Sequence, residues 1–124
     1  MVLSENKNQS LTLDSLAKLV DGEIVTHSEN LDEVVEFAFA SDLMSDVLML
    51  ESDKVLLITG LANPQVIRTA EMSDINYIII ARRKKCSTEM LELARECNIT
   101  LIESNYSVFR ISGLLFGHGI KPIF

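Results

Sequence analysis

The residues whose types best suit ligand binding lie in a short turn between an apolar run and a helix. Thr59 and Gly60 follow the run 55–58, and Asn63 and Gln65 stand on either side of a proline. Glycine lets the backbone turn sharply, and the free amides at a helix start favour an anionic group. The loop is shorter than a Walker A phosphate loop, GxxxxGK[ST]. A tight turn followed by a helix cap also explains these residue types, so both interpretations stay open.

A second candidate is the run Arg82–Lys85, which holds four of the eleven bases of an otherwise acidic chain. Guanidinium and ammonium groups here could hold a phosphate or an acidic partner, and Arg82 and Lys84 are the candidate contacts. A solvated loop is the alternative interpretation, because charged runs usually stay in water.

Asp42 and Ser45 form the third candidate. We expect Asp42 to begin a helix over residues 42–50, with its carboxylate reaching the Ser45 amide. Asp42 and Asp46 lie four residues apart, so both could project from one helical face and hold Mg²⁺ beside a phosphate. A plain cap and a surface acid explain the same pair, and we predict neither a metal site nor a cofactor.

The stretch 54–81 must position these groups, because it reads as strand, turn, helix and strand. Residues 55–58 and 77–80 are apolar runs without alternation, which is typical of parallel strands buried on both faces. Between them, Asn63 is a good N-cap and Pro64 suits the first helical position. The stretch therefore predicts a right-handed βαβ unit.

The rest of the chain supplies further elements at regular spacing. Apolar periodicity predicts helices that begin at Thr12, at residue 87 and near Asn105, and strands over 23–26, 33–40 and 100–102. Gly22 is expected to end the first helix in the left-handed conformation, and Gly117 and Gly119 to end the last. The tail 121–124 is a candidate edge strand. We predict one three-layer α/β domain over 11–124, with a mostly parallel sheet flanked by helices, after a flexible head at 1–10.

Composition excludes several functional classes. A net charge of −7 argues against nucleic-acid or anionic-membrane binding, and the apolar runs are far shorter than the roughly 20 residues of a membrane span. The polar N-terminus lacks the pattern of a signal peptide, so we expect a cytoplasmic protein.

Cys86 and Cys97 are separated by a helix of about 15 Å, which predicts reduced thiols. His27 and His118 have no sequence partner for catalysis and no GxSxG motif is present, so we predict no enzyme.

In open α/β sheets, ligands bind beyond the carboxyl ends of the strands. We therefore expect the candidate residues to converge at that edge of the sheet; they are Thr59, Gly60, Asn63, Gln65, Arg82, Lys84, Asp42 and Ser45.

Several segments resemble one family. The stretches ASDLMSDVLML (40–50), LLITGLANPQVIRTAEMSDI (56–75), LELARECNI (91–99) and SVFRISGLLFGHGI (107–120) look like those of a small stand-alone DRTGG-domain protein. The likeness covers about Leu11 to Ile120, although the literal string DRTGG is absent. It implies a fold similar to the N-terminal domain of HPr kinase/phosphorylase. It also implies a regulatory or dimer-forming module, since catalysis in such proteins lies in another domain.

Together these observations predict a non-catalytic regulatory or ligand-sensing module that forms a homodimer, with the partner along the helix 65–74. The expected ligand is an anionic small molecule or nucleotide. One alternative is a small anion- or nucleotide-binding protein with phosphoryl-related chemistry. Another is a protein–protein adaptor for a redox or metal enzyme.

Overall fold

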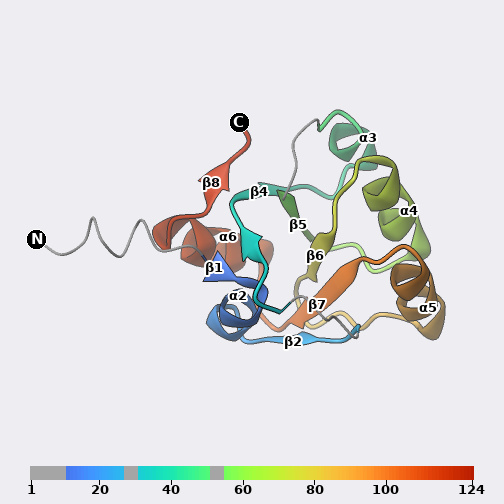
Figure 1. Ribbon diagram of the computed structural model, residues 1–124, viewed down its shortest axis with the longest axis horizontal. Coiled ribbons are helices and arrows are strands. Elements are labelled where there is room, and N and C mark those ends of the chain that lie inside the picture. Colours follow the sequence, from blue (N-terminus) through green and yellow to red (C-terminus); the bar gives the residue numbers. More distant parts are fainter. Residues whose placement is uncertain (1–10, 27–30, 51–54) are drawn as a thin grey trace, which may run out of the picture.

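A computed structural model describes residues 11–26, 31–50 and 55–124, so the expectations for the head 1–10 and for His27 lie outside the described residues. Figure 1 shows a central sheet with helices on both sides. The helices are α2 (Leu13–Leu19), α3 (Met44–Val47), α4 (Pro64–Met72), α5 (Thr88–Glu96) and α6 (Val108–Gly117). The strands are β1 (Leu11–Thr12), β2 (Gly22–Ile24), β3 (Val34–Val35), β4 (Phe37–Ala40), β5 (Val55–Thr59), β6 (Tyr77–Ile80), β7 (Thr100–Ser104) and β8 (Lys121–Pro122).

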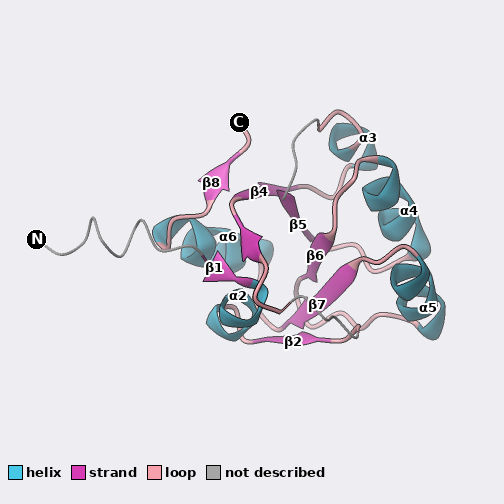
Figure 2. Cartoon of the chain, in the orientation of Figure 1, coloured by secondary structure: helices cyan, strands magenta, loops and turns pink. Residues whose placement is uncertain are grey.

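The main sheet confirms the predicted mostly parallel architecture. Its six strands run in the order β2-β7-β6-β5-β4-β8, and all its pairings are parallel except that of β2 with β7. Helices α3, α4 and α5 cover one face and α2 and α6 the other, as the cyan ribbons of Figure 2 show. Strands β1 and β3 form a separate two-stranded antiparallel sheet.

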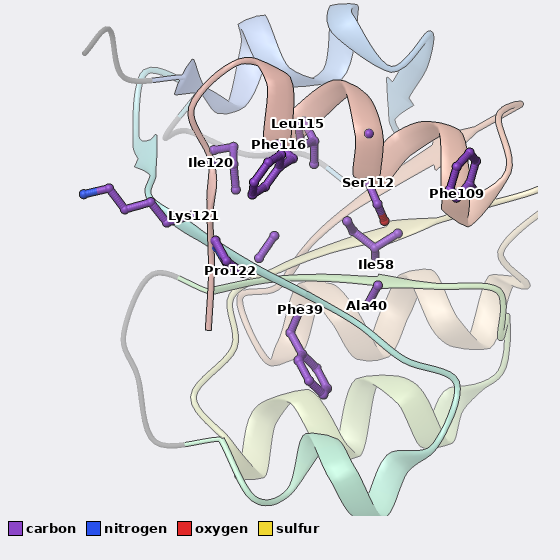
Figure 3. A pocket seen from close by; sticks show the side chains of 12 residues that line it. Phe39, Ala40, Ile58, Phe109, Ser112, Leu115, Phe116, Ile120, Lys121 and Pro122 are labelled. Atoms are coloured by element: carbon purple, nitrogen blue, oxygen red, sulfur yellow. The ribbon is translucent and has the colours of Figure 1, made fainter. Parts of the chain in front are cut away.

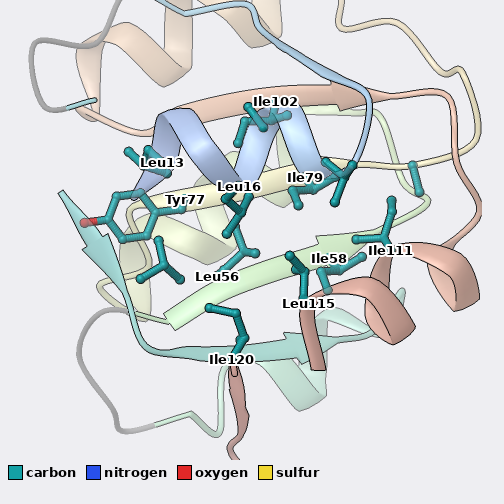
Figure 4. Close-up of a cluster of buried hydrophobic side chains, with 14 residues drawn as sticks. Leu13, Leu16, Leu56, Ile58, Tyr77, Ile79, Ile102, Ile111, Leu115 and Ile120 are labelled. Atoms are coloured by element: carbon teal, nitrogen blue, oxygen red, sulfur yellow. The ribbon is translucent and has the colours of Figure 1, made fainter. Parts of the chain in front are cut away.

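The βαβ unit is confirmed as predicted. All five residues of β5 and all four of β6 are buried, and their side chains alternate between two hydrophobic clusters. Leu56 and Ile58 face α2 and α6 (Figure 4). Leu57 packs in the cluster on the α4 side, so each face of the strand is covered. Asn63 caps α4 by accepting a hydrogen bond from the Val66 amide at 3.2 Å. The missing alternation in the sequence thus reflects burial on both faces.

The expected strand 33–40 is wrong as a single element. It divides at Glu36 into β3, which pairs with β1, and β4, which joins the main sheet. The Glu33 backbone oxygen accepts from the Leu13 amide at 3.0 Å, and the Glu33 carboxylate accepts from the Tyr77 hydroxyl. These contacts tie the small sheet to the core, and burial together with Glu33 raises the pKa of Tyr77.

The start of the last helix differs slightly from expectation, whereas its end agrees. The helix begins at Val108, because Ser107, two positions after Asn105, is the N-cap and accepts from the Arg110 amide at 3.1 Å. Gly117 is the last residue of that helix, and Gly119 has a positive φ, 99°. The tail does supply an edge strand, since β8 pairs in parallel with β4.

Gly22 has a different role from the predicted helix stop. Asp21 takes the left-handed conformation, with a φ of 50°, and Gly22 begins β2 instead. A Cβ on Gly22 would lie 2.6 Å from Ile102 Cγ2 and 3.3 Å from the Ala17 carbonyl oxygen. Glycine is therefore needed here for close packing rather than for its backbone freedom.

Replacing Gly22 with alanine is expected to lower the free energy of unfolding by about 1–3 kcal/mol. Ile102 is fully buried and its β-branched side chain turns with difficulty, so the strand must shift. Urea titration followed by circular dichroism measures the change. Gly113→Ala in α6 is the matched control, because its Cβ would meet nothing within 4 Å. The control should gain roughly 0.5–1 kcal/mol from helix propensity. Equal behaviour of the two variants would refute the packing role.

Candidate functional site

The carboxyl ends of four parallel strands meet at one edge of the sheet. Asp42 follows β4, Gly60 follows β5, Arg82 follows β6 and Tyr106 follows β7. The Ala81 amide donates to the Thr59 carbonyl at 2.9 Å and the Arg82 amide to the Tyr106 carbonyl at 2.8 Å. Hydrogen bonds thus hold neighbouring strand ends together just beyond the sheet, where ligands bind in open α/β folds.

Asp42 is not the helix cap that the sequence predicted. Its Oδ1 accepts hydrogen bonds from the Thr59 hydroxyl at 2.8 Å and from the Gly60 amide at 2.7 Å. The hydrogen bond from Gly60 is the main reason why the pKa of Asp42 lies below its ordinary value. The Thr59 hydroxyl and the charges of Arg82 and Lys84 lower it further, and partial burial opposes them. The carboxylate therefore closes the turn after β5 instead of beginning α3.

The Arg82 side chain lies over the same turn. Its Nε and Nη2 would each be 3.5 Å from a Cβ built on Gly60, and Asp42 Oδ2 would be 3.3 Å from it. Gly60 thus lies between a carboxylate and a guanidinium group, and the missing side chain lets both groups approach the backbone. The structure brings together four predicted site residues here, Asp42, Thr59, Gly60 and Arg82, and Lys84 is close enough to affect the pKa of Asp42.

The basic loop holds an uncommon backbone conformation. Arg82 and Arg83 have φ values of 64° and 63°, two consecutive left-handed residues that are not glycine. Such residues cost of order 1 kcal/mol each and concentrate at functional sites. Bonds from the Arg82 and Arg83 amides to the carbonyls of Tyr106 and Ser104, at 2.8 and 3.0 Å, hold them in place.

The far end of the basic loop is attached to β7 through Glu103. Its carboxylate accepts from the Cys86 amide at 2.8 Å and pairs with Lys85 at 3.4 Å. Burial raises the pKa of the Cys86 thiol to about 12, and Glu103 adds to the effect. Lys85 therefore has a structural partner, and Cys86 is a protonated thiol at neutral pH; both cysteines are free.

Three predicted site residues do not join this cluster through any hydrogen bond that the described residues make. The side-chain oxygen of Asn63 accepts the hydrogen bond that caps α4, and Gln65 is exposed in the first turn of that helix. Ser45 is exposed within α3, which begins at Met44 with Leu43 as its N-cap. A Ser41 hydroxyl that accepts from the Leu43 amide at 2.9 Å shapes this turn instead.

Sequence reasoning missed an apolar groove beside the cluster. It lies between α6 and the strands β4 and β8, has a volume of about 370 Å³, and has Phe109 and Phe116 on its helix side (Figure 3). The available signal was the spacing in the last helix. Ile111 and Leu115 fill the core, so phenylalanines at 109 and 116 must face outward.

Within 11–26, 31–50 and 55–124, no group of three or more His, Cys, Asp or Glu side chains is placed to hold a metal ion. None of the helices in these ranges has the length and apolar character needed to cross a bilayer.

Asp42→Ala is expected to lower the free energy of unfolding by about 1–2 kcal/mol at pH 7, because two donors lose an acceptor. The pKa of Asp42 is lowered from 3.8 in the folded state, so its stabilisation is present above pH 3.8. It is lost as the pH falls through the lower folded pKa, and the difference between wild type and variant should shrink there. Urea titrations at pH 7, 5 and 3 measure it. Asp46→Ala, in the exposed first turn of α3, should change stability by less than about 0.5 kcal/mol.

Comparison with known proteins agrees with the fold. A family model described as the DRTGG domain matches residues 15–116. The search of curated proteins found no match. Among solved structures, a similar chain comes from Clostridium perfringens: the CBS and DRTGG domains of the regulatory region of a pyrophosphatase, complexed with its activator diadenosine tetraphosphate.

The two folds superpose with a TM-score of 0.74 at 18% sequence identity, over 97% of this chain and 50% of the pyrophosphatase chain. The present chain thus spans about half the length of that relative. The likeness confirms the predicted fold. Because the family model covers well over half of the residues, the protein belongs to the DRTGG domain family.

Proposed function

We propose that this protein is a regulatory module that senses an anionic small molecule, such as a nucleotide, at the carboxyl edge of its sheet. DRTGG domains are regulatory modules, in agreement with the accessory role expected from the sequence. The module acts in the cytoplasm and by binding rather than by catalysis, and both points stay predictions.

One observation supports the site most directly: the Arg82 guanidinium lies over the glycine turn of β5, on a backbone held in the left-handed conformation. Lys85 is paired with Glu103, so the charges that Arg82, Arg83 and Lys84 bring to this edge are the ones available to a ligand. In a protein of net charge −7, three clustered cations attract an anion locally.

The solved relative supports the choice of ligand class. Its activator, diadenosine tetraphosphate, carries several phosphates and two nucleobases. A phosphate is well matched to guanidinium and ammonium donors, because arginine can offer two parallel hydrogen bonds to it. We therefore favour a phosphate-bearing ligand over a carboxylate.

A thermal-shift titration with ATP, diadenosine tetraphosphate and inorganic phosphate tests this site. A ligand at 100 times its Kd should add about 2.7 kcal/mol to the stability of the wild type, and Arg82→Gln with Lys84→Gln should remove most of the rise in Tm. Arg95→Gln is the matched control, an exposed base on α5 at a distance from the loop in sequence. An equal rise in all three proteins would reject the basic loop as the binding site.

The homodimer also stays a proposal, and a group of exposed apolar side chains supports it. Leu48, Met49 and Met72 are 47%, 74% and 72% exposed on α4 and the turn after α3. The Ser73 hydroxyl donates to the Val47 carbonyl at 3.1 Å, so the segments that carry these apolar side chains lie side by side. An apolar patch of this kind suits a second copy of the chain.

Met72→Glu is expected to convert a dimer of roughly twice 13.8 kDa into the monomer, because two like charges would meet at a two-fold interface. Sedimentation equilibrium at micromolar concentration measures the mass. Phe109→Glu, at a residue that is 89% exposed on α6, which covers the other face of the sheet, should leave the dimer intact. A monomeric wild type would exclude the homodimer.

A further inference from the structure

The groove beneath α6 is lined in part by residues that directly precede the proposed anion site along the chain. Its floor includes Ala40 and Ile58, and its helix side carries Phe109, Gly113 and Phe116. Figure 3 shows Phe109 and Ser112 at one end, next to Ala40 and Ile58, and Lys121 with Pro122 at the other. With about 370 Å³ of space and mostly apolar walls, it has the size and character of a small-molecule pocket.

Three stretches of backbone connect this groove to the polar cluster. Asp42 follows the groove residue Ala40 by two positions, and Gly60 follows Ile58 by two positions. On α6, Phe109 lies three positions after Tyr106, whose carbonyl accepts from the Arg82 amide at 2.8 Å. Two residues of extended chain cover roughly 7 Å. The groove residues Ala40 and Ile58 thus lie about the length of a ribose from Asp42 and Gly60 along the chain.

The groove lining suits a flat aromatic group. Phe109 and Phe116 are 89% and 69% exposed, although each carries a large apolar ring. Stacking on such rings stabilises a nucleobase and tolerates different bases, because every base has a π-face. Between the two rings, Gly113 leaves room, since a Cβ there would meet nothing within 4 Å.

Asp42 adjoins both the groove and Arg82, since it follows the groove residue Ala40 by two positions and approaches the same point above Gly60 as Arg82 does. The hydrogen bonds that it receives from Thr59 and Gly60 use Oδ1. Its Oδ2 points toward the space above Gly60, 3.3 Å from where a Cβ would be. Carboxylates accept hydrogen bonds from ribose hydroxyls in dinucleotide-binding α/β folds, so Asp42 is suited to the sugar of a ligand whose base fills the groove.

We propose that the groove between α6 and β4 binds the base of a nucleoside phosphate, with the ribose at Asp42 and the phosphate at Arg82 and Lys84. The phosphate end rests on the proposed function above, whereas the base pocket is a separate assignment. The order groove, carboxylate and cations matches the order base, ribose and phosphate. A groove of about 370 Å³ suits a small molecule, whereas the α3–α4 patch, formed by the exposed side chains of Leu48, Met49 and Met72, is proposed for the second copy.

Filling the groove tests the base pocket. Gly113→Leu places a side chain in the open space and favours the helix, so it should fold. Gly117→Leu is the matched control, because it stands in the same helix with equal open space but outside the groove lining. Thermal unfolding and circular dichroism verify that both variants are folded before binding is measured.

Calorimetric titrations with AMP, GMP, CMP, UMP, ribose 5-phosphate and octyl phosphate supply the binding data. At least one nucleotide should bind the wild type ten-fold or more tighter than ribose 5-phosphate does. Gly113→Leu should remove that advantage, and Gly117→Leu should keep it. Asp42→Ala should weaken the nucleotide and ribose 5-phosphate alike.

Other outcomes would contradict either the base pocket or the anion site, and they can be told apart. If every nucleotide binds no better than ribose 5-phosphate while Arg82→Gln weakens both, the anion site stands and the base pocket is refuted. If Gly113→Leu abolishes nucleotide binding and Arg82→Gln leaves it unchanged, the base pocket stands and the proposed anion site fails. Tight binding of octyl phosphate without nucleotide binding would assign the groove to an aliphatic chain and refute the proposal. So would a change of oligomeric mass in Gly113→Leu, since a second copy would then cover the groove.

Discussion

The parallel pairing of β4, β5, β6 and β7 is the constraint on which the rest of the molecule depends. Parallel strands need a covered crossover between them, and here helices cover both faces, so β5 and β6 can be apolar throughout. The same pairing sends the carboxyl ends of four strands to one edge. Segments that are far apart in the sequence therefore end at the same edge of the sheet, with Asp42 beside Gly60 and Arg82 beside Tyr106.

At that edge, short hydrogen bonds fix the loops that follow the strands in defined positions. The Asp42 carboxylate satisfies the Gly60 amide and the buried Thr59 hydroxyl, which fixes the turn after β5. The left-handed backbone of Arg82 and Arg83 costs free energy, and their amides offset part of it by bonding the carbonyls at the end of β7. The two loops lie against each other, because the Arg82 Nε and Nη2 would each be 3.5 Å from a Cβ built on Gly60.

The sequence predicted what depends on neighbours along the chain. The apolar runs of β5 and β6, the Asn63 cap and the family segments all follow from residues within a few positions of one another, and each was confirmed. The wrong predictions concern residues whose role depends on a partner far away in the sequence. Asp42 resembles a helix cap, but its acceptor capacity is used by Gly60, eighteen positions away. Gly22 resembles a helix stop, but Ile102 requires its missing side chain. The groove could not be predicted, because α6 returns over β4 about seventy residues later in the chain.

The positions of these features also indicate how ligand binding would affect other parts of the molecule. Asp42 lies between the groove residue Ala40 and α3, which begins at Met44, and Ser41 hydrogen-bonds the Leu43 amide within that connection. In the proposed arrangement, a ligand that contacts Asp42 therefore acts on the segment that carries the apolar α3–α4 patch. Binding can shift an equilibrium only by the difference in affinity for the two states. For the module to act as a sensor in this way, the turn 41–43 must have different conformations in the two states. The turn leads directly into α3 and is held by the local bond between Ser41 and Leu43, so a change in the turn would be passed through α3 to the second copy.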